Sequence, residues 1–510
     1  MPAEALPIPA ALALRREHDA RLPALVSDDG AIAWAELDDA SRTLASRLVR
    51  AGVGKGDRVG LLMPNGIDWA TVAFAVMRVG AVLVPLSTLL RPPELLAQLR
   101  VASVSQLVTA REYRGRSYLD DLRSLAPELG PGFARRHPLL PALRAIWVWG
   151  ALPEAPAPAG MIEALEGAVA PADDMVVLFT SGSRGAPKGV IHTHGSALRS
   201  TAAGLEARCV GAGERLYIPM PFFWTGGFGG GLLSVLLAGA TLLTESTPEP
   251  GRTLRFLERE RATLFRGWPD QAARIAAHPD FARADLSSLR PASLAAVLPP
   301  AQRPRPGARA NLFGMTESGG PYCGARLDRD LPHDKHGSCG RPFAGVEVRI
   351  VDGEIQLRGP NLMRGICGRI RSEVFTADDW YPTGDLGRLD DDGYLWYAGR
   401  RDDMFKVKGA TVYPTEVESG LRSIPGVAQA FVTDVDGDGG AKEVAALVVS
   451  KEAEVEGLAA AARVRLSAFK VPTLWLVVRD PDALPISATG KIDKRALQAL
   501  LVSRGVRARG

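Results

Sequence analysis

Apolar and polar positions alternate near the start of the chain in a pattern that predicts a parallel β-sheet covered by helices. The apolar run at residues 59–63 predicts a strand, and helical spacing of apolar residues over 67–79 predicts a helix that stops at Gly80. We interpret Asn65 as the cap of this helix. A second apolar run, 81–85, predicts another strand, and a strand, helix and strand in this order indicate a parallel pair.

Similar alternation recurs at residues 175–179 and 240–243. We therefore predict an α/β fold with a large body of parallel sheets and helices over residues 1–399. The remaining residues, 400–510, predict a small α+β domain with strands at 427–432, 444–449 and 474–478.

The helix predicted at the start of this small domain has two sequence signals. Pro414 is typical of a first helical position, and Thr415 and Glu418 stand at the spacing of a capping box. We place the join between the two parts near residues 399–403.

Composition excludes several classes of function. The net charge of +4 comes from 61 basic and 57 acidic residues spread along the chain, which disfavours a nucleic-acid partner. The longest apolar stretch, 232–243, contains Gly239 and is too short for membrane insertion. Four isolated cysteines fit a reducing compartment, and the first residues lack signal-peptide order, so we predict a cytoplasmic protein.

A glycine-rich and hydroxyl-rich loop follows the predicted strand at 175–179. Backbone N–H groups in such a loop approach an anion closely, the hydroxyls add donors and the lysine adds a positive charge, so we predict a polyphosphate site. The spacing is not that of the Walker A motif. The residues are Thr180, Ser181, Gly182, Ser183, Gly185 and Lys188.

Three further segments carry candidate nucleotide-binding groups. In the segment that runs from Phe313 through Gly314 and Met315, the aromatic ring could stack on a base. Thr316 could donate to a phosphate, and Glu317 offers a carboxylate for a hard cation. Asp385 could accept hydrogen bonds from ribose hydroxyls, Arg400 follows at the join, and Lys491 stands in a Gly-Lys segment near the C-terminus.

The order of these motifs resembles the adenylate-forming superfamily of acyl-CoA synthetases, peptide-synthetase adenylation domains and beetle luciferases, over nearly the whole chain. The resemblance implies an ATP-dependent ligase that forms an acyl-AMP and passes the acyl group to coenzyme A. ATP, Mg²⁺ and coenzyme A are the expected cofactors, and a carboxylic acid is the expected substrate. A homodimer is one assembly that we consider for the protein.

The resemblance also implies roles for individual residues. The loop from Thr180 to Lys188 would hold the β- and γ-phosphates, Thr316 would contact the α-phosphate, and Glu317 would bind Mg²⁺. Asp385 and Arg400 would hold the ribose. Lys491 would lie between the carboxylate and the α-phosphate, where a cation offsets the repulsion of two anions. Asp402 would be the hinge of a rotating C-terminal domain that brings Gly409 to the coenzyme A tunnel.

The predicted acyl pocket departs from the family pattern. Trp224 stands where many relatives have histidine, beside Phe223 and Gly226, and residues 219–240 contain no carboxylate that could pair with a substrate amino group. Ala295 and Ala296 replace a glycine-rich segment of the family. We therefore expect a hydrophobic acid, bulky or polycyclic, and not an amino acid.

Two alternative functions remain open. One is an acyl-AMP ligase that loads a carrier protein, although residues 359–380 show no insertion of the kind typical of that class. The other is a relative that forms thioesters with impaired adenylation, which the change at Ala295 and Ala296 suggests.

Two other patterns are weaker. His192, Thr193 and His194 could suggest a metal site, but a structural or capping role is favoured because no third ligand is evident. The acidic run at 434–439 resembles the start of a calcium loop, yet Ala445 stands at the twelfth position, so we interpret it as a hairpin turn.

Overall fold

The computed structural model describes residues 6–131, 137–152, 154–180, 187–407, 410–437, 442–466, 468–487 and 491–508. The chain divides into two compact units. The first comprises Met1–Glu347 and Arg358–Trp380, and the second comprises Val348–Leu357 and Tyr381–Gly510. The predicted boundary at 399 does not coincide with an edge of these compact units, and the hinge expected there stays a prediction.

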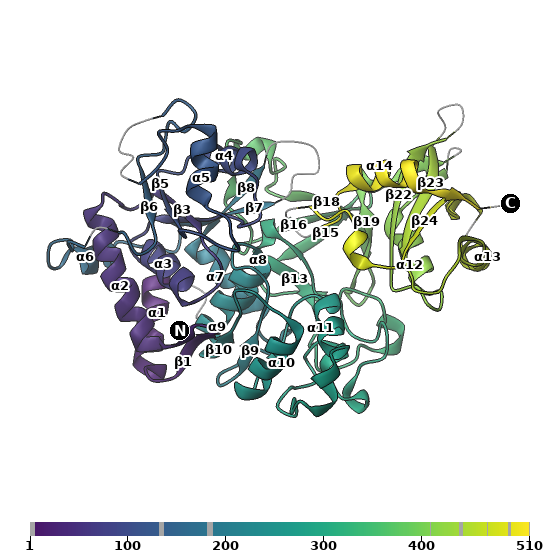
Figure 1. The fold of residues 1–510 in the computed structure, drawn as a ribbon, viewed down its shortest axis with the longest axis horizontal. Helices are drawn as coiled ribbons and strands as arrows, with labels where there is room; N and C mark the ends of the chain where they lie inside the picture. The colour runs from purple at the N-terminus through teal and green to yellow at the C-terminus, as the bar shows by residue number, and fades with distance from the viewer. Residues whose placement is uncertain are drawn as a thin grey trace. The chain divides into compact units, whose positions relative to one another are not determined.

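The central sheet of the first unit is mostly parallel and has helices on both faces (Figure 1). Strand β8 is antiparallel to β7, and the strands from β7 to β6 run parallel. The strand order is β17 (Gly365–Ile366), β8 (Lys188–Thr193), β7 (Asp174–Thr180), β4 (Val82–Pro85), β3 (Arg58–Leu62), β5 (Gln106–Thr109) and β6 (Ala145–Val148).

A second sheet of the first unit is parallel except for β2, and a three-stranded antiparallel sheet follows. The second sheet has the order β11 (Leu264–Phe265), β9 (Arg215–Tyr217), β10 (Thr241–Leu243), β1 (Pro23–Ser27) and β2 (Gly30–Ala33). The small sheet consists of β12 (Phe313–Met315), β13 (Gly320–Gly324) and β14 (Arg341–Pro342).

Helices cover these sheets, and α3 packs in the core that the two larger sheets share. Because α3 is apolar nearly all round, it buries residues on every face. The α-helices of the unit are α1 (Ile8–Asp19), α2 (Trp34–Arg50), α3 (Ile67–Arg78), α4 (Pro92–Val101), α5 (Tyr118–Leu125), α6 (Met161–Gly167), α7 (His194–Ala203), α8 (Thr225–Gly227), α9 (Ser234–Ala238), α10 (Pro250–Arg259) and α11 (Pro269–Ala276).

The predicted strand, helix and strand at 59–85 are confirmed as β3, α3 and β4, with the strands parallel. The predicted cap is wrong. The residue before α3 is Gly66, and the side chain of Asn65 bonds to a distant loop: its Nδ2 donates to the Met220 carbonyl at 2.9 Å and its Oδ1 accepts from the Phe222 N–H at 2.8 Å. Asn65 therefore links the ends of the two larger sheets.

The second unit contains a four-stranded sheet, a hairpin and a terminal sheet between helices. The strands are β15 (Glu347–Val351), β16 (Glu354–Arg358), β18 (Tyr381–Leu389) and β19 (Leu395–Arg400), then β20 (Phe405–Val407) and β21 (Ala410–Val412), then β22 (Gln429–Asp436), β23 (Lys442–Val449), β24 (Leu474–Val478) and β25 (Val506–Arg507). The helices are α12 (Pro414–Arg422), α13 (Val455–Arg465) and α14 (Lys494–Arg504).

The terminal sheet buries both of its faces because side chains alternate along β23. Ala446 and Val448 pack in one apolar cluster with α12 and α13, whereas Ala445 and Leu447 pack in another with α14. Strands β22 and β23 pair antiparallel on either side of the predicted hairpin turn, with 434–436 already in the ladder. Residues 438–441 of this turn lie outside the described residues.

The predicted capping box at the start of α12 is wrong. Thr415 Oγ1 donates to the Ala398 carbonyl at 2.9 Å, and Glu418 accepts from the backbone N–H of Val432 at 3.0 Å. Both side chains bond to other elements of the fold, so neither caps the helix. In the described part of the chain, no helix has the length and apolar character needed to cross a membrane.

Candidate active site

The predicted phosphate loop begins at the end of β7 and ends at the start of β8, two antiparallel neighbours. Thr180 and Lys188 are directly opposite each other in the antiparallel ladder, at the ends of the two strands. The predicted residues Ser181, Gly182, Ser183 and Gly185 fall in 181–186, outside the described residues. The hairpin register therefore brings the first and last predicted members of the loop together.

A short turn between β12 and β13 carries Thr316 and Glu317. Glu317 is only 5% exposed, and Lys188 Nζ donates to its carboxylate. A buried carboxylate without a partner is costly, so the ammonium group stabilises its charge. Two residues that are 129 positions apart in the sequence thus form one ion pair.

The backbone of this turn is held from two sides. His192 Nε2 lies 2.7 Å from the Thr316 carbonyl, and the Met363 N–H donates to the Glu317 carbonyl at 2.8 Å. Gly319 ends the turn with φ +70°, and a Cβ there would lie 2.3 Å from Ser200 Oγ. Only glycine allows this close approach of the turn to α7.

Burial also determines the state of His192. The imidazole is enclosed, and this desolvation lowers the pKa of His192, so the ring is neutral near pH 7. Because a carbonyl oxygen only accepts, Nε2 carries the proton. The other nitrogen, Nδ1, lies 3.3 Å from Ser196 Oγ and can accept from it.

The side chain of Thr316 contacts the predicted acyl segment. Thr225 Oγ1 donates to Thr316 Oγ1 at 3.3 Å. Thr225 begins α8, which continues into the π-helical turn η2 (Phe228–Leu233). This hydrogen bond joins the Thr316 turn to the segment around Gly226, one of the residues predicted to line the acyl pocket.

The segment before Thr316 has a glycine that no other residue could replace without movement. A Cβ at Gly314 would lie 2.2 Å from the Gly320 carbonyl oxygen on the neighbouring strand. Phe313 is partly exposed and meets Tyr322 edge to face, with ring centroids 5.6 Å apart. Met315, at the end of β12, is also partly exposed.

Aromatic rings gather at the predicted acyl segment. Trp224 is partly exposed and packs edge to face against Trp268, with centroids 5.6 Å apart, and against the buried Phe223 at 5.3 Å. Trp268 directly precedes α11. Ala295 and Ala296 lie in a short 3₁₀ turn that packs against α11; Ala295 is exposed and Ala296 is half-buried.

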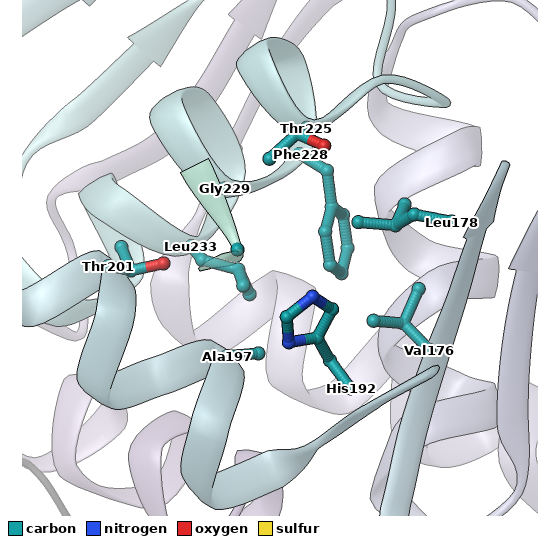
Figure 2. Close-up of a pocket in the computed structure, with 10 residues that line it drawn as sticks. Val176, Leu178, His192, Ala197, Thr201, Thr225, Phe228, Gly229 and Leu233 are labelled. Carbon is teal, nitrogen blue, oxygen red and sulfur yellow. The ribbon is translucent and has the colours of Figure 1, made fainter. Parts of the chain in front are cut away.

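A small cavity lies beside α8 and η2. Figure 2 shows His192, Thr201, Phe228 and Leu233 around it, and Thr225 lies at its upper edge. Its volume of 10 Å³ holds about one water molecule. The predicted acyl residues Phe223, Trp224, Gly226, Ala295 and Ala296 do not line it, and their role stays a prediction.

The second unit carries the remaining predicted residues. Asp385 is buried, stands opposite Arg400 in the β18–β19 ladder and accepts a hydrogen bond from Arg400 Nη1 at 3.0 Å. Asp402 lies in the short turn Arg401–Asp403 that follows β19. Lys491 is exposed, and Gly409 is outside the described residues.

These groups suit a nucleotide and its cation. Glu317 offers carboxylate oxygens, the ligands that Mg²⁺ prefers, and its ammonium partner is a group that binds phosphate. Asp385 and its guanidinium partner have the chemistry of a diol-binding pair, because the carboxylate oxygens can accept hydrogen bonds from two hydroxyl groups.

Comparison with known proteins gives the same assignment. A family described as "AMP-binding enzyme" matches residues 13–367. The chain belongs to this family. The AMP-binding chain is 34% identical over 493 residues to a "3-[(3aS,4S,7aS)-7a-methyl-1,5-dioxo-octahydro-1H-inden-4-yl]propanoyl:CoA ligase" of Mycobacterium tuberculosis, covering 94% of this chain and 95% of that protein. It is 34% identical over 490 residues to a "Feruloyl-CoA synthase" of Amycolatopsis sp, covering 91% and 93%.

A solved structure of the anthranilate CoA ligase AuaEII, in complex with anthranoyl-AMP, is 25% identical and superposes with a TM-score of 0.81, covering 98% of this chain and 99% of that one. The predicted resemblance and fold class are confirmed. The protein is an AMP-forming acid–thiol ligase, and enzymes of this family use ATP, Mg²⁺ and coenzyme A.

The long-range contacts of three polar residues at the site were not predicted from sequence. Asn65 was interpreted as a cap, His192 as structural or capping, and Thr225 was not singled out. Each bonds to a residue more than 90 positions away, so local spacing carries no signal for these contacts. The capping interpretation holds for Thr193, whose side chain accepts from the Ser196 N–H at the start of α7.

Proposed function

We propose that the protein activates a bulky, hydrophobic carboxylic acid, of polycyclic type, and joins it to coenzyme A. A carboxylate oxygen of the acid attacks the α-phosphorus of ATP, and the bond to pyrophosphate breaks. The thiol sulfur of coenzyme A then attacks the acyl carbon, AMP leaves, and the thiol proton is released. This sequence makes and breaks one bond at each step.

The observation that carries the substrate proposal is the open space beside the helical segment formed by α8 and η2. Thr225, at its start, contacts Thr316, and Gly230 lies about one turn further on. A Cβ at Gly230 would meet no atom within 4 Å among the described residues, so the helix leaves open space there. The partly exposed ring of Trp224, backed by Trp268, offers an apolar face to a ring system.

Two relatives support a cyclic acid by their names. One acts on a fused bicyclic propanoyl acid and the other forms feruloyl-CoA, which has an aromatic ring. Their sequences cover more than nine-tenths of this chain. A cyclic, largely apolar acid is therefore our proposal for this chain as well.

The remaining roles are assigned on the same proposal. The loop from Thr180 to Lys188 holds the terminal phosphates and Glu317 holds Mg²⁺, which neutralises phosphate charge when bound. Thr316 contacts the α-phosphate while Asp385 and Arg400 hold the ribose. Phe313, with Gly314 and Met315, borders the nucleotide.

The two half-reactions are assigned to two positions of the C-terminal domain. Lys491 serves the first half-reaction, and rotation at Asp402 brings Gly409 to the thiol for the second.

The proposal is tested by ATP–pyrophosphate exchange with a panel of acids. The panel contains indane-type bicyclic propanoic acids, aromatic propenoic acids, linear medium-chain acids and phenylalanine, with coenzyme A or a holo-carrier protein as acceptor. We expect kcat/KM for bicyclic acids to exceed that for linear acids by about tenfold or more, with coenzyme A as the better acceptor.

A glycine substitution makes this test specific. Gly230→Leu fills the open space, so bicyclic acids should lose about tenfold or more in kcat/KM while linear acids change little. Gly167→Leu, at a similarly open position in the distant helix α6, is the matched control. Absence of exchange with every acid, or an unchanged preference in Gly230→Leu, would contradict the proposal.

A further inference from the structure

Strand β8 contacts the Thr316–Glu317 turn with two different side chains. Lys188, at its start, pairs with the Glu317 carboxylate, and His192, four residues later, reaches the Thr316 carbonyl at 2.7 Å. Residues four apart in a strand point to the same face. Side chains of one strand therefore bond both to a side chain of the turn and to the backbone of the turn.

The His192 ring is held by its surroundings in one orientation. It is 1% exposed, and its Nδ1 lies 3.3 Å from Ser196 Oγ, which in turn accepts from the Thr193 N–H at 3.1 Å. With Nδ1 turned to Ser196, the Nε2–H points at the Thr316 carbonyl. Figure 2 shows the ring between Val176, Ala197 and Phe228, apolar groups that offer no other hydrogen-bond partner.

On the side that faces β8 and α7, the polar side chain of His192 bonds to the turn backbone. Gly319 packs against Ser200 without a side chain of its own, and the cavity beside the ring holds only about one water molecule. The Thr316 carbonyl also accepts from the Gly319 N–H at 2.9 Å, but that donor belongs to the turn itself. Loss of the imidazole would remove the donor that ties this carbonyl to β8, so the turn would no longer be held in place from that strand. A shift of the carbonyl moves the Thr316 hydroxyl and the Glu317 carboxylate with it.

We propose that His192 is a positioning residue for adenylation: its Nε2–H holds the Thr316 carbonyl and thereby directs Thr316 toward the α-phosphate and Glu317 toward Mg²⁺. The inference rests on the proposed roles of Thr316 and Glu317. His192 itself does not touch a reactant.

The experiment compares two amide substitutions. In His192→Gln the amide nitrogen reaches the place of Nε2 and can donate to Thr316, whereas in His192→Asn it reaches only the place of Nδ1. Both substitutions introduce a polar amide that is no larger than the imidazole. The two variants therefore disturb the packing around position 192 to a similar degree. His333→Asn, at an exposed histidine, is the control for the substitution itself.

The first readout is binding of ATP by calorimetry, with and without Mg²⁺, which needs no acid substrate. For His192→Asn we expect the Mg²⁺-dependent gain in affinity to fall about tenfold or more, with Mg²⁺-free ATP binding within about twofold of the wild type. His192→Gln should keep most of that gain. The second readout is exchange, where kcat should fall about 10- to 100-fold in His192→Asn with KM for the acid little changed.

The outcomes separate this proposal from the preceding one. Equal losses in the Asn and Gln variants, at an unchanged melting temperature, would show a packing role and overturn the inference. Wild-type Mg²⁺ dependence in His192→Asn would also overturn it. A third outcome is that the wild type supports ATP–pyrophosphate exchange with none of the acids while the Asn and Gln variants still differ in their Mg²⁺-dependent affinity for ATP. In that case the substrate proposal would fail and the positioning role of His192 would stand.

Discussion

At the scale of single residues, His194 has the most unusual environment. It starts α7, is fully buried, and its Nδ1 accepts from the Ile8 N–H at 3.3 Å. Burial lowers the pKa of His194 from 6.5 to about 4. A proton on Nδ1 would face that N–H, so the folded protein keeps the ring neutral.

This shift predicts a pH dependence of stability. Between pH 6.5 and pH 4 the unfolded chain binds a proton at His194 that the folded chain does not, so the free energy of unfolding falls as the pH falls. The loss should reach about 2 kcal/mol between pH 7 and pH 5. Denaturant unfolding at the two pH values measures it.

A substitution separates His194 from the other titrating groups. In His194→Asn the amide oxygen can still accept from Ile8 but does not titrate, so this part of the pH slope should disappear. His18→Asn, at an exposed histidine, should leave the slope unchanged. An identical slope in both variants would show that other groups cause the acid sensitivity.

The chemical type of most site residues could be predicted from sequence, because a carboxylate, an ammonium or a hydroxyl has the same chemistry wherever it lies. Glu317 and Lys188 illustrate this, and the structure adds that they form one ion pair. Asn65 and His192 could not be predicted, because their partners are fixed by tertiary packing and not by neighbours in the chain.

At the scale of elements, a buried arginine joins three helices. Arg78, at the end of α3, is 1% exposed and bonds to Asp38 on α2 and Glu166 on α6, each at 2.6 Å. It also donates to Ser41 at 2.8 Å. The sequence pattern predicts α3 because its apolar period is regular, but it does not indicate that the last residue of the helix forms this network.

Removal of this guanidinium should destabilise the protein strongly. Arg78→Met removes the buried partner of Asp38 and Glu166 and leaves them only the more exposed Arg16 and Arg42. Breaking a buried pair costs about 3–5 kcal/mol, so we expect a loss toward the lower end of that range. Arg261→Met, which breaks an exposed pair with Asp285, should cost less than about 1 kcal/mol. Similar midpoints for the two variants in urea would show that the Arg78 network contributes little.

Element boundaries show where sequence patterns stop being sufficient. Strand β24 was predicted with its observed ends, because its apolar run is bounded by polar residues. The strands β22 and β23 extend further into the hairpin than predicted, since Lys442 pairs with Asp434 and Asp436 and thereby shields their charges. The pattern of apolar residues does not show that these charged residues can pair within the sheet, so it predicts strands that end too early.

At the scale of the whole molecule, the chain is made of two compact units, and the proposed reaction needs residues from both. Thr316 and Glu317 belong to the first, whereas Asp385, Arg400 and Lys491 belong to the second. The predicted boundary at 399 assigned Arg400 and Lys491 to the C-terminal part but left Asp385 in the large body. The sequence could not show that residues 348–357 and 381–399 belong with the C-terminal unit, because β16 pairs with β18 across an intervening segment.

Lys491→Ala tests the division of labour between the half-reactions. Without the ammonium group, formation of acyl-AMP should fall about hundredfold or more, because two anions then meet without a counter-charge. Conversion of preformed acyl-AMP and coenzyme A to thioester should stay within a few fold of the wild type. Chromatography of acyl-AMP and acyl-CoA measures both rates.

The control for this prediction is Lys451→Ala, which removes an exposed lysine of the same unit. Undiminished acyl-AMP formation in Lys491→Ala would refute the assigned role. Parallel loss of both half-reactions would indicate a general defect of the unit.

The glycine at position 230 also bears on how this enzyme can diverge. A residue without a side chain has no atoms to lose, so every mutation there can only take up volume. On this account, substrate range at that position drifts in one direction, toward smaller acids, and a lineage that has narrowed regains the larger ones there only by reverting to glycine.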